Sequence, residues 1–168
     1  MLFYILVVVI FSSCNGKSPN KDINKTDGIE KKPLQTVSVI KKITFKDIHG
    51  KWQLKYLNNY GYSFRFYRNF KSIIILYLKN YALVFKGVYT IEEKNKIRVN
   101  VFAVKNESDL YRINFRRGFT KTKSSHFIFN GYLDKTKKFL VIRPLKIVID
   151  GNTSQGYFEP VIKLKRIK

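Results

Sequence analysis

Short runs of β-branched and aromatic residues, separated by polar turns, fill the chain from about residue 37 onward. Apolar and polar residues alternate in 51–57 and again in 110–116. A period of two is typical of strands that place one face in a core and the other in water. The segment Ile73–Leu78 is apolar throughout, which predicts a strand covered on both faces.

We predict about ten short strands and no helix, with the strands at 51–57, 62–68, 72–78, 82–91, 96–104, 110–116, 126–133, 138–143, 145–149 and 161–167. Tight links such as Asn58–Gly61 and Asp134–Lys137 join neighbouring strands. Because closure removes exposed sheet edges, a meander of this length tends to form a barrel. The predicted fold is therefore all-β, an antiparallel up-and-down meander that closes into a roughly eight-stranded barrel.

The N-terminal thirteen residues carry no charge and contain the apolar run Leu2–Phe11. This run is too short to span a bilayer as a helix but has the length of a signal-peptide core. Phe11-Ser12-Ser13-Cys14 resembles the lipobox of bacterial lipoproteins, and Cys14 is the single cysteine of the chain. The resemblance implies a signal peptide at 1–13 and a lipid anchor on Cys14. We expect an exported protein anchored at the outer membrane, on its periplasmic face or at the cell surface.

The segment after the predicted cleavage point, 14–36, is rich in Asn, Lys, Asp, Gly and Pro. It has too few large apolar residues to offset the entropy of ordering it. We interpret it as a tether between the lipid and a barrel domain at 37–168.

The composition is consistent with a single hydrophobic core and with a strongly positive surface. The 168 residues are 45% apolar and 15% aromatic, which suits one packed domain. Lys and Arg number 33 against 11 Asp and Glu, a formal charge of +22. Such a field favours encounters with polyanions, although lysines can also simply keep a secreted protein in solution.

Gly50-Lys51-Trp52 resembles the Gly-x-Trp that opens the first strand of lipocalins and related barrels. Thr44–Asp47 before it is suited to capping the short helical turn at the entry of that fold. The resemblance implies a barrel floor in which a basic residue of the last strand, Arg166 or else Lys165, packs over Trp52.

A barrel of eight strands is the smallest that can hold a small ligand. The first functional hypothesis is therefore a membrane-anchored lipoprotein that binds a lipid or another small hydrophobic molecule. Alternation assigns the candidate cup to Tyr56, Phe64, Phe66, Phe85, Tyr89, Phe115 and Phe129. The same pattern would arise in a filled barrel without a cavity.

The second hypothesis is a surface interaction lipoprotein with a filled barrel. Its candidate contact with an anionic polysaccharide or a host protein is the densest basic segment, with Arg116, Arg117, Lys121 and Lys123. Cations also interleave with aromatics in Arg65–Arg68, as in proteins that bind single-stranded nucleic acid, but the export signal argues against that partner. An outer-membrane barrel is disfavoured because several predicted strands are too short to cross.

No catalytic motif stands out. His49 and His126, the two histidines, lack ligand spacing around them, and there is no nucleophile elbow or phosphate-binding loop. We therefore expect no enzyme, no cofactor and no metal, and the sequence assigns no oligomeric state.

Overall fold

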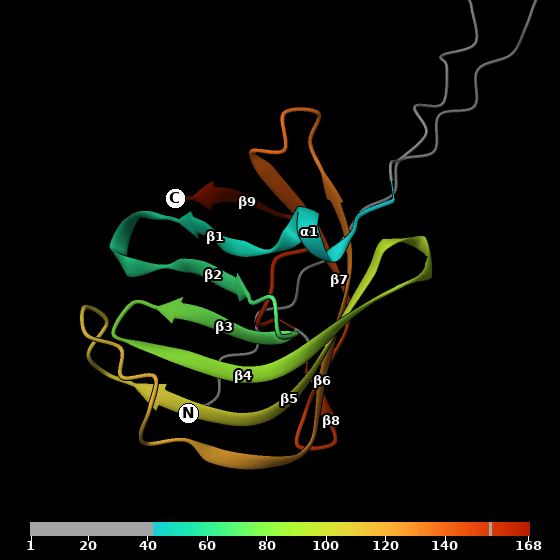
Figure 1. The fold of residues 1–168 in the computed structure, drawn as a ribbon. Coiled ribbons are helices and arrows are strands. Elements are labelled where there is room, and N and C mark those ends of the chain that lie inside the picture. Colours follow the sequence, from blue (N-terminus) through green and yellow to red (C-terminus); the bar gives the residue numbers. More distant parts are fainter. Residues whose placement is uncertain (1–41, 155) are drawn as a thin grey trace, which may run out of the picture. The chain divides into compact units, whose positions relative to one another are not determined.

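Eight strands close into an antiparallel barrel in the computed structural model, which describes residues 42–154 and 156–168 (Figure 1). The predicted signal peptide, Cys14 and the tether lie outside the described residues. The described elements are α1 (Phe45–Ile48), β1 (Gly50–Lys55), η1 (Leu57–Asn59), β2 (Gly61–Phe66), β3 (Lys71–Leu78), β4 (Tyr81–Glu92), η2 (Glu93–Asn95), β5 (Lys96–Glu107), β6 (Thr120–Leu133), β7 (Phe139–Ile149), β8 (Asn152–Thr153) and β9 (Ile162–Ile167).

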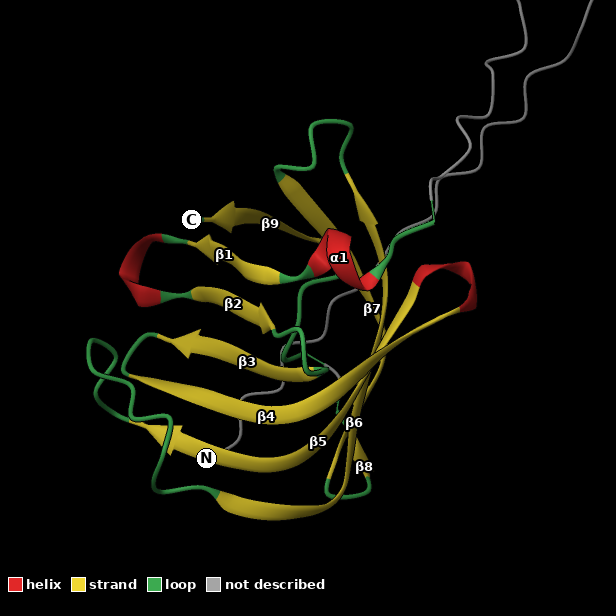
Figure 2. Ribbon diagram, viewed as in Figure 1, coloured by secondary structure: helices red, strands yellow, loops and turns green. Residues whose placement is uncertain are grey.

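The strands follow an up-and-down order. Each strand from β1 to β7 pairs with the next, and β9 pairs with both β7 and β1 to close the barrel. The two-residue β8 pairs only with the end of β7. Strands make up most of the described chain, and helical turns lie at the connections (Figure 2). The predicted all-β, up-and-down barrel is confirmed, and the architecture is consistent with a lipocalin-like barrel.

Alternation builds the interior as predicted. Trp52 of β1 is opposite Phe64 of β2, Phe64 is opposite Ile74 of β3, and Ile74 is opposite Phe85 of β4. All four side chains are buried in one apolar cluster. Their outward neighbours in sequence, such as Lys51, are partly exposed. The strand register therefore aligns these four large apolar side chains in one row on the inner face of β1 to β4.

Two irregularities shift the alternation. Phe102 is an extra residue in β5, because Val101 pairs with Gly87 and Ala103 with Lys86. In β7, Pro144 pairs with Phe129 and Lys146 with Ile128, so one residue bulges between them. The prediction of two separate strands at 138–143 and 145–149 was wrong, since Pro144 stays paired with Phe129 and the strand continues through a bulge at Leu145.

The predicted strand at 110–116 was also wrong. Residues 108–119 form a loop, and polar side chains satisfy its backbone N–H groups: Asp109 Oδ1 accepts from Tyr111 N and Arg112 N at 3.0 and 2.9 Å. Such local bonds compete with strand pairing. The apolar residues of the loop cover the outer face of β3 and β4, where Ile75 and Val84 are fully buried. This cover explains why Ile73–Leu78 is apolar on both faces.

Candidate functional site

Trp52 fills the end of the barrel interior next to α1. Its side chain is buried, and its Nε1 donates a hydrogen bond to the backbone oxygen of Ile48 at 2.6 Å. The guanidinium of Arg166 lies 4.5 Å from the centroid of the Trp52 ring and donates to the backbone oxygen of Asp47. Gly50 opens β1 with φ +123°, so the chain turns from α1 directly into the strand. Lys165, the alternative partner, is exposed and lies opposite Gln53.

The one-turn helix α1 is held in place by a capping box. Thr44 Oγ1 accepts from Asp47 N at 3.4 Å, and Asp47 Oδ2 accepts from Thr44 N at 3.1 Å. Asp47 Oδ1 also accepts from Lys137 Nζ at 2.9 Å. The hydrogen bond from Lys137, followed by that from Thr44, lowers the pKa of Asp47 to about 2. Asp47 thus ties the entry turn to the β6–β7 connection.

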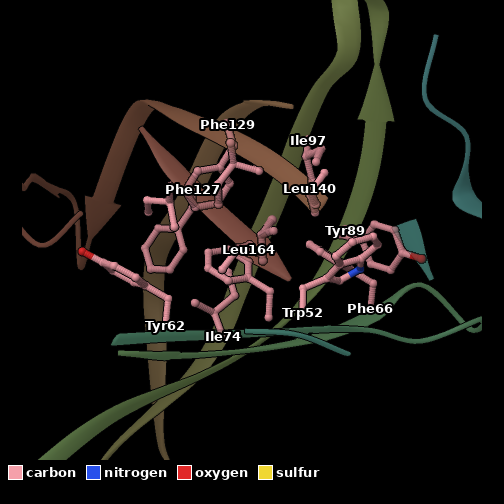
Figure 3. Close-up of a cluster of buried hydrophobic side chains, with 14 of the residues drawn as sticks. Trp52, Tyr62, Phe66, Ile74, Tyr89, Ile97, Phe127, Phe129, Leu140 and Leu164 are labelled. Atoms are coloured by element: carbon pink, nitrogen blue, oxygen red, sulfur yellow. The ribbon is translucent and has the colours of Figure 1, made fainter. Parts of the chain in front are cut away.

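The interior is packed with aromatic rings. Of the seven predicted cup residues, five are buried there, namely Phe64, Phe66, Phe85, Tyr89 and Phe129. Ring centroids of Phe66 and Tyr89 lie 4.9 Å apart, and those of Phe64 and Phe129 lie 5.6 Å apart, both edge to face. Trp52, Phe66 and Tyr89 gather toward one end, and Tyr62 and Phe127 lie toward the other (Figure 3).

The far end of the interior is occupied by Phe158, which the sequence analysis missed. Its ring centroid lies 5.4 Å from that of Phe129 and 5.6 Å from that of Phe127, and it stacks on Tyr62 at 5.9 Å. It lies outside every strand, between β8 and β9, so alternation could not find it. An aromatic between Gly156 and Pro160, in a connection, was the available signal.

Glu159 fixes the segment that carries Phe158. Its carboxylate accepts hydrogen bonds from Tyr56 Oη at 2.7 Å and from Tyr62 Oη at 3.4 Å. The hydrogen bond to Glu159 raises the pKa of Tyr56 to about 12. Residues 156–161, the plug segment, are therefore held in place by the ring contacts of Phe158 and by the hydrogen bonds to the Glu159 carboxylate.

Two predicted cup residues lie elsewhere. Tyr56 follows β1 rather than ending it, and is 45% exposed, because the strand stops at Lys55 and its alternation stops with it. Phe115 belongs to the loop 108–119 and packs on the outer apolar cluster. Neither residue faces the interior, so both assignments to the cup were wrong.

The predicted polyanion contact is exposed. Arg116, Arg117, Lys121 and Lys123 all face solvent. The backbone N–H groups of Arg116 and Arg117 donate to Asn114 Oδ1 at 2.8 and 3.3 Å, which fixes the turn that presents them. Within the described ranges the salt bridges are Arg98–Glu92, Lys105–Glu107 and Lys137–Asp47, so none of these four cations is paired.

The loop 108–119, which presents Arg116 and Arg117 and leads into Lys121 and Lys123 of β6, is fastened to the barrel wall by aromatic rings. The guanidinium of Arg65 lies 4.6 Å from the centroid of Phe115. Lys86 Nζ lies 3.9 Å from the centroid of Phe119, and Lys105 Nζ lies 5.3 Å from it. These cation–π contacts add to the apolar burial of the same rings. These contacts therefore fix the position of the loop from which Arg116 and Arg117 project.

The histidines do not form a site. His49 lies at the end of α1, and His126 lies on β6, where burial and then Lys146 and Arg98 lower its pKa. No group of three or more His, Cys, Asp or Glu residues within 42–154 and 156–168 could hold a metal ion. Among the same residues, no helix has the length and apolar character needed to cross a membrane.

Comparison of the chain with models of protein families, with curated proteins and with solved structures found no match.

Proposed function

We propose that the protein is an exported lipoprotein whose barrel binds anionic polymers through outward cations, with Arg116, Arg117, Lys121 and Lys123 as the main contact. The binding is electrostatic and reversible, and it involves no catalytic step. Cys14 supplies the lipid anchor at the outer membrane.

The observation that carries the proposal is the contrast between the two faces of the barrel wall. The interior is occupied by aromatic side chains in mutual contact, with Phe158 among them. The four cations are exposed and free of carboxylate partners in the described chain; Arg116 and Arg117 lie on the fastened loop, and Lys121 and Lys123 at the start of β6. With 33 basic against 11 acidic residues, the chain cannot neutralise its own surface.

The test is a titration of the full chain with fluorescent dextran sulfate. Reversal of the four cations to Glu should weaken binding at least about tenfold and flatten its salt dependence. The matched control reverses four other exposed lysines, Lys55, Lys79, Lys135 and Lys165, with the same change in net charge. Equal losses in both variants would mean that net charge alone drives binding, and the assigned contact would be wrong.

The anchor has a separate test. Mass spectrometry of the protein from membranes of an expressing bacterium should find a mature chain that begins at Cys14 and carries acyl groups. Cys14→Ser should move the protein out of the membrane fraction. An unmodified Cys14 in the membrane-bound protein would contradict the anchor.

A second function, binding of a small apolar molecule, is favoured by the way in which the interior is closed. Phe158 is contributed by a connection rather than a strand, and it is partly exposed. A ring held by a connection can be displaced by a ligand that enters the interior. Native mass spectrometry of the full chain with cell lipids, with and without Phe158→Ala, tests this function. A stoichiometric lipid adduct on the unaltered chain would support it, and no adduct on either folded protein would exclude it.

A further inference from the structure

The β2–β3 turn, Tyr67–Phe70, separates two hollows on the outside of the barrel. Arg68 and Phe70 line one hollow of about 600 Å³, and Tyr67 and Asn69 line the other, of about 450 Å³. Neighbouring turn residues therefore face opposite sides of one narrow ridge. The segment is part of the stretch in which cations interleave with aromatics, and the proposed function does not use it.

The first hollow combines aromatic walls with unpaired cations. The rings of Phe45 and Phe70 meet edge to face with centroids 4.9 Å apart, and remain 39% and 49% exposed. Lys46, His49 and Arg68 also line the hollow, and Lys46 and Arg68 have no salt bridge in the described part of the chain. Tyr89 forms the base of the hollow, 5.8 Å from Phe45. A ligand here meets apolar faces and positive charge together.

The second hollow repeats this composition. Tyr67 and Phe102 are its aromatic walls, 39% and 47% exposed, and Lys71 and Lys86 are its cations. Phe102 is the extra residue of the β5 bulge, and bulges often redirect a side chain toward a site. Ser72 and Ile73 of β3 also lie in its lining.

The ridge between the hollows is held in a strained shape. Phe70 has φ +61°, a conformation that is rare and costly for a bulky residue. Hydrogen bonds enforce it, since Phe70 N donates to Tyr67 O at 3.1 Å and Phe70 O accepts from Tyr89 N at 2.8 Å. The Tyr89 hydroxyl donates to Tyr67 O at 3.1 Å from within the barrel. Lys79, Lys94 and Lys137 adopt the same conformation in other hairpin turns, so here it fixes the turn that presents the Phe70 ring.

We propose that the two hollows are successive subsites for an acidic oligosaccharide, which crosses the β2–β3 turn. The apolar faces of two sugar rings pack on Phe45 with Phe70 and on Phe102 with Tyr67. Their carboxylates bind Arg68 and Lys71, since a guanidinium can donate two hydrogen bonds to one carboxylate. The repeat of aromatic pairs and cations matches a repeating polymer. Rings that line hollows suit discrete sugars better than a membrane, into which aromatics insert from a protruding tip.

This inference rests on the proposed function, because an exported protein meets glycans rather than nucleic acid. It adds a ligand class and a site distant in sequence from Arg116–Lys123. Because the two sites use different residues, variants can separate them.

The test is calorimetric titration of the full chain with a polyuronate hexasaccharide and with its carboxyl-reduced form. We expect the reduced form to bind at least about tenfold more weakly. Phe70→Asn, Phe102→Ala and Arg68→Gln should each weaken binding of the acidic form about fivefold or more. Asn accepts a positive φ, so Phe70→Asn keeps the ridge, and Arg68→Gln changes only an exposed head group. The emission of Trp52 checks that each variant is folded.

Outcomes separate this inference from the proposed function. Unchanged hexasaccharide affinity in all three variants, with loss on reversal of the Arg116–Lys123 cations, would overturn the two subsites and leave the proposed function standing. Binding of neither the hexasaccharide nor dextran sulfate would overturn both. Binding of a single-stranded oligonucleotide but not of the hexasaccharide, with loss in Phe70→Asn, would overturn the glycan assignment.

Discussion

Arg166 lies directly opposite Trp52 in the β1–β9 ladder, with its guanidinium 4.5 Å from the centroid of the indole ring. The same guanidinium donates to the backbone of Asp47, and the indole donates to the backbone of Ile48. First strand, last strand and entry helix therefore meet at one cation–π pair. Because the two strands are the ends of the barrel domain in sequence, this pair reports directly on closure.

Arg166→Ala should lower the free energy of unfolding by about 1–3 kcal/mol, since it removes a cation–π contact and a hydrogen bond. Denaturant unfolding followed by tryptophan fluorescence measures it, because Trp52 is the single tryptophan. Lys165→Ala, one residue away and exposed, should change stability by less than about 0.5 kcal/mol. Equal effects of the two changes would argue against the role of the pair in closure.

Asp47 should make part of the folding stability depend on pH. Its pKa is about 2 in the folded protein against an ordinary 3.8, so its contribution is complete above pH 3.8. It is lost as the pH falls from there toward 2. Thermal melts of Asp47→Asn and of the unaltered chain should differ most above about pH 4 and converge toward pH 2. Lys137→Gln should show a smaller change of the same sign. A difference that does not vary with pH would contradict the pKa assignment.

Gly61 should tolerate no side chain. Its φ is +147°, and an added Cβ would lie 2.3 Å from the backbone oxygen of Leu54. Gly61→Ala should therefore lower the free energy of unfolding by more than about 2 kcal/mol. Gly151→Ala is the matched control, since Gly151 has φ +84° but no atom within 4 Å of an added Cβ. It should cost about 1 kcal/mol, and a similar cost at both sites would contradict the close approach.

The loop 108–119 should loosen when its aromatic fastening is removed. Phe119→Ala deletes the ring that lies over Lys86 and Lys105 and covers the outer apolar cluster. Limited trypsin digestion should then cut near Arg116 and Arg117 about tenfold faster. Tyr111→Ala removes an aromatic that is 90% exposed in the same loop, and should leave the rate unchanged. Unchanged cleavage after Phe119→Ala would show that other contacts hold the loop.

Alternation predicted the barrel because it is a direct consequence of strand geometry. It placed Phe64, Phe85 and Phe129 inside, where they are buried. It failed at Phe115, because side chains such as Asp109 and Asn114 satisfy the loop's backbone and release it from the sheet. It could not find Phe158, whose burial depends on a long-range fold rather than on a local period.

The hollows at the β2–β3 turn were equally hidden from the sequence. Arg65–Arg68 showed the mixture of cations and aromatics, but not that Phe45 and Phe102 would join it from α1 and β5. Their meeting depends on register and on the bulge at Phe102. Position in the fold, rather than residue type, makes these side chains a candidate site.

Hydrogen exchange of the full chain, with and without dextran sulfate, tests most directly whether ligands bind outside the barrel rather than within it. The account predicts slower exchange of backbone amides in 108–123, and in the β2–β3 turn where an acidic chain also reaches it. Exchange in residue 154 and in the plug segment, 156–161, should be unchanged. Slower exchange confined to the plug segment, or none at 108–123 with the polymer bound, would contradict the account.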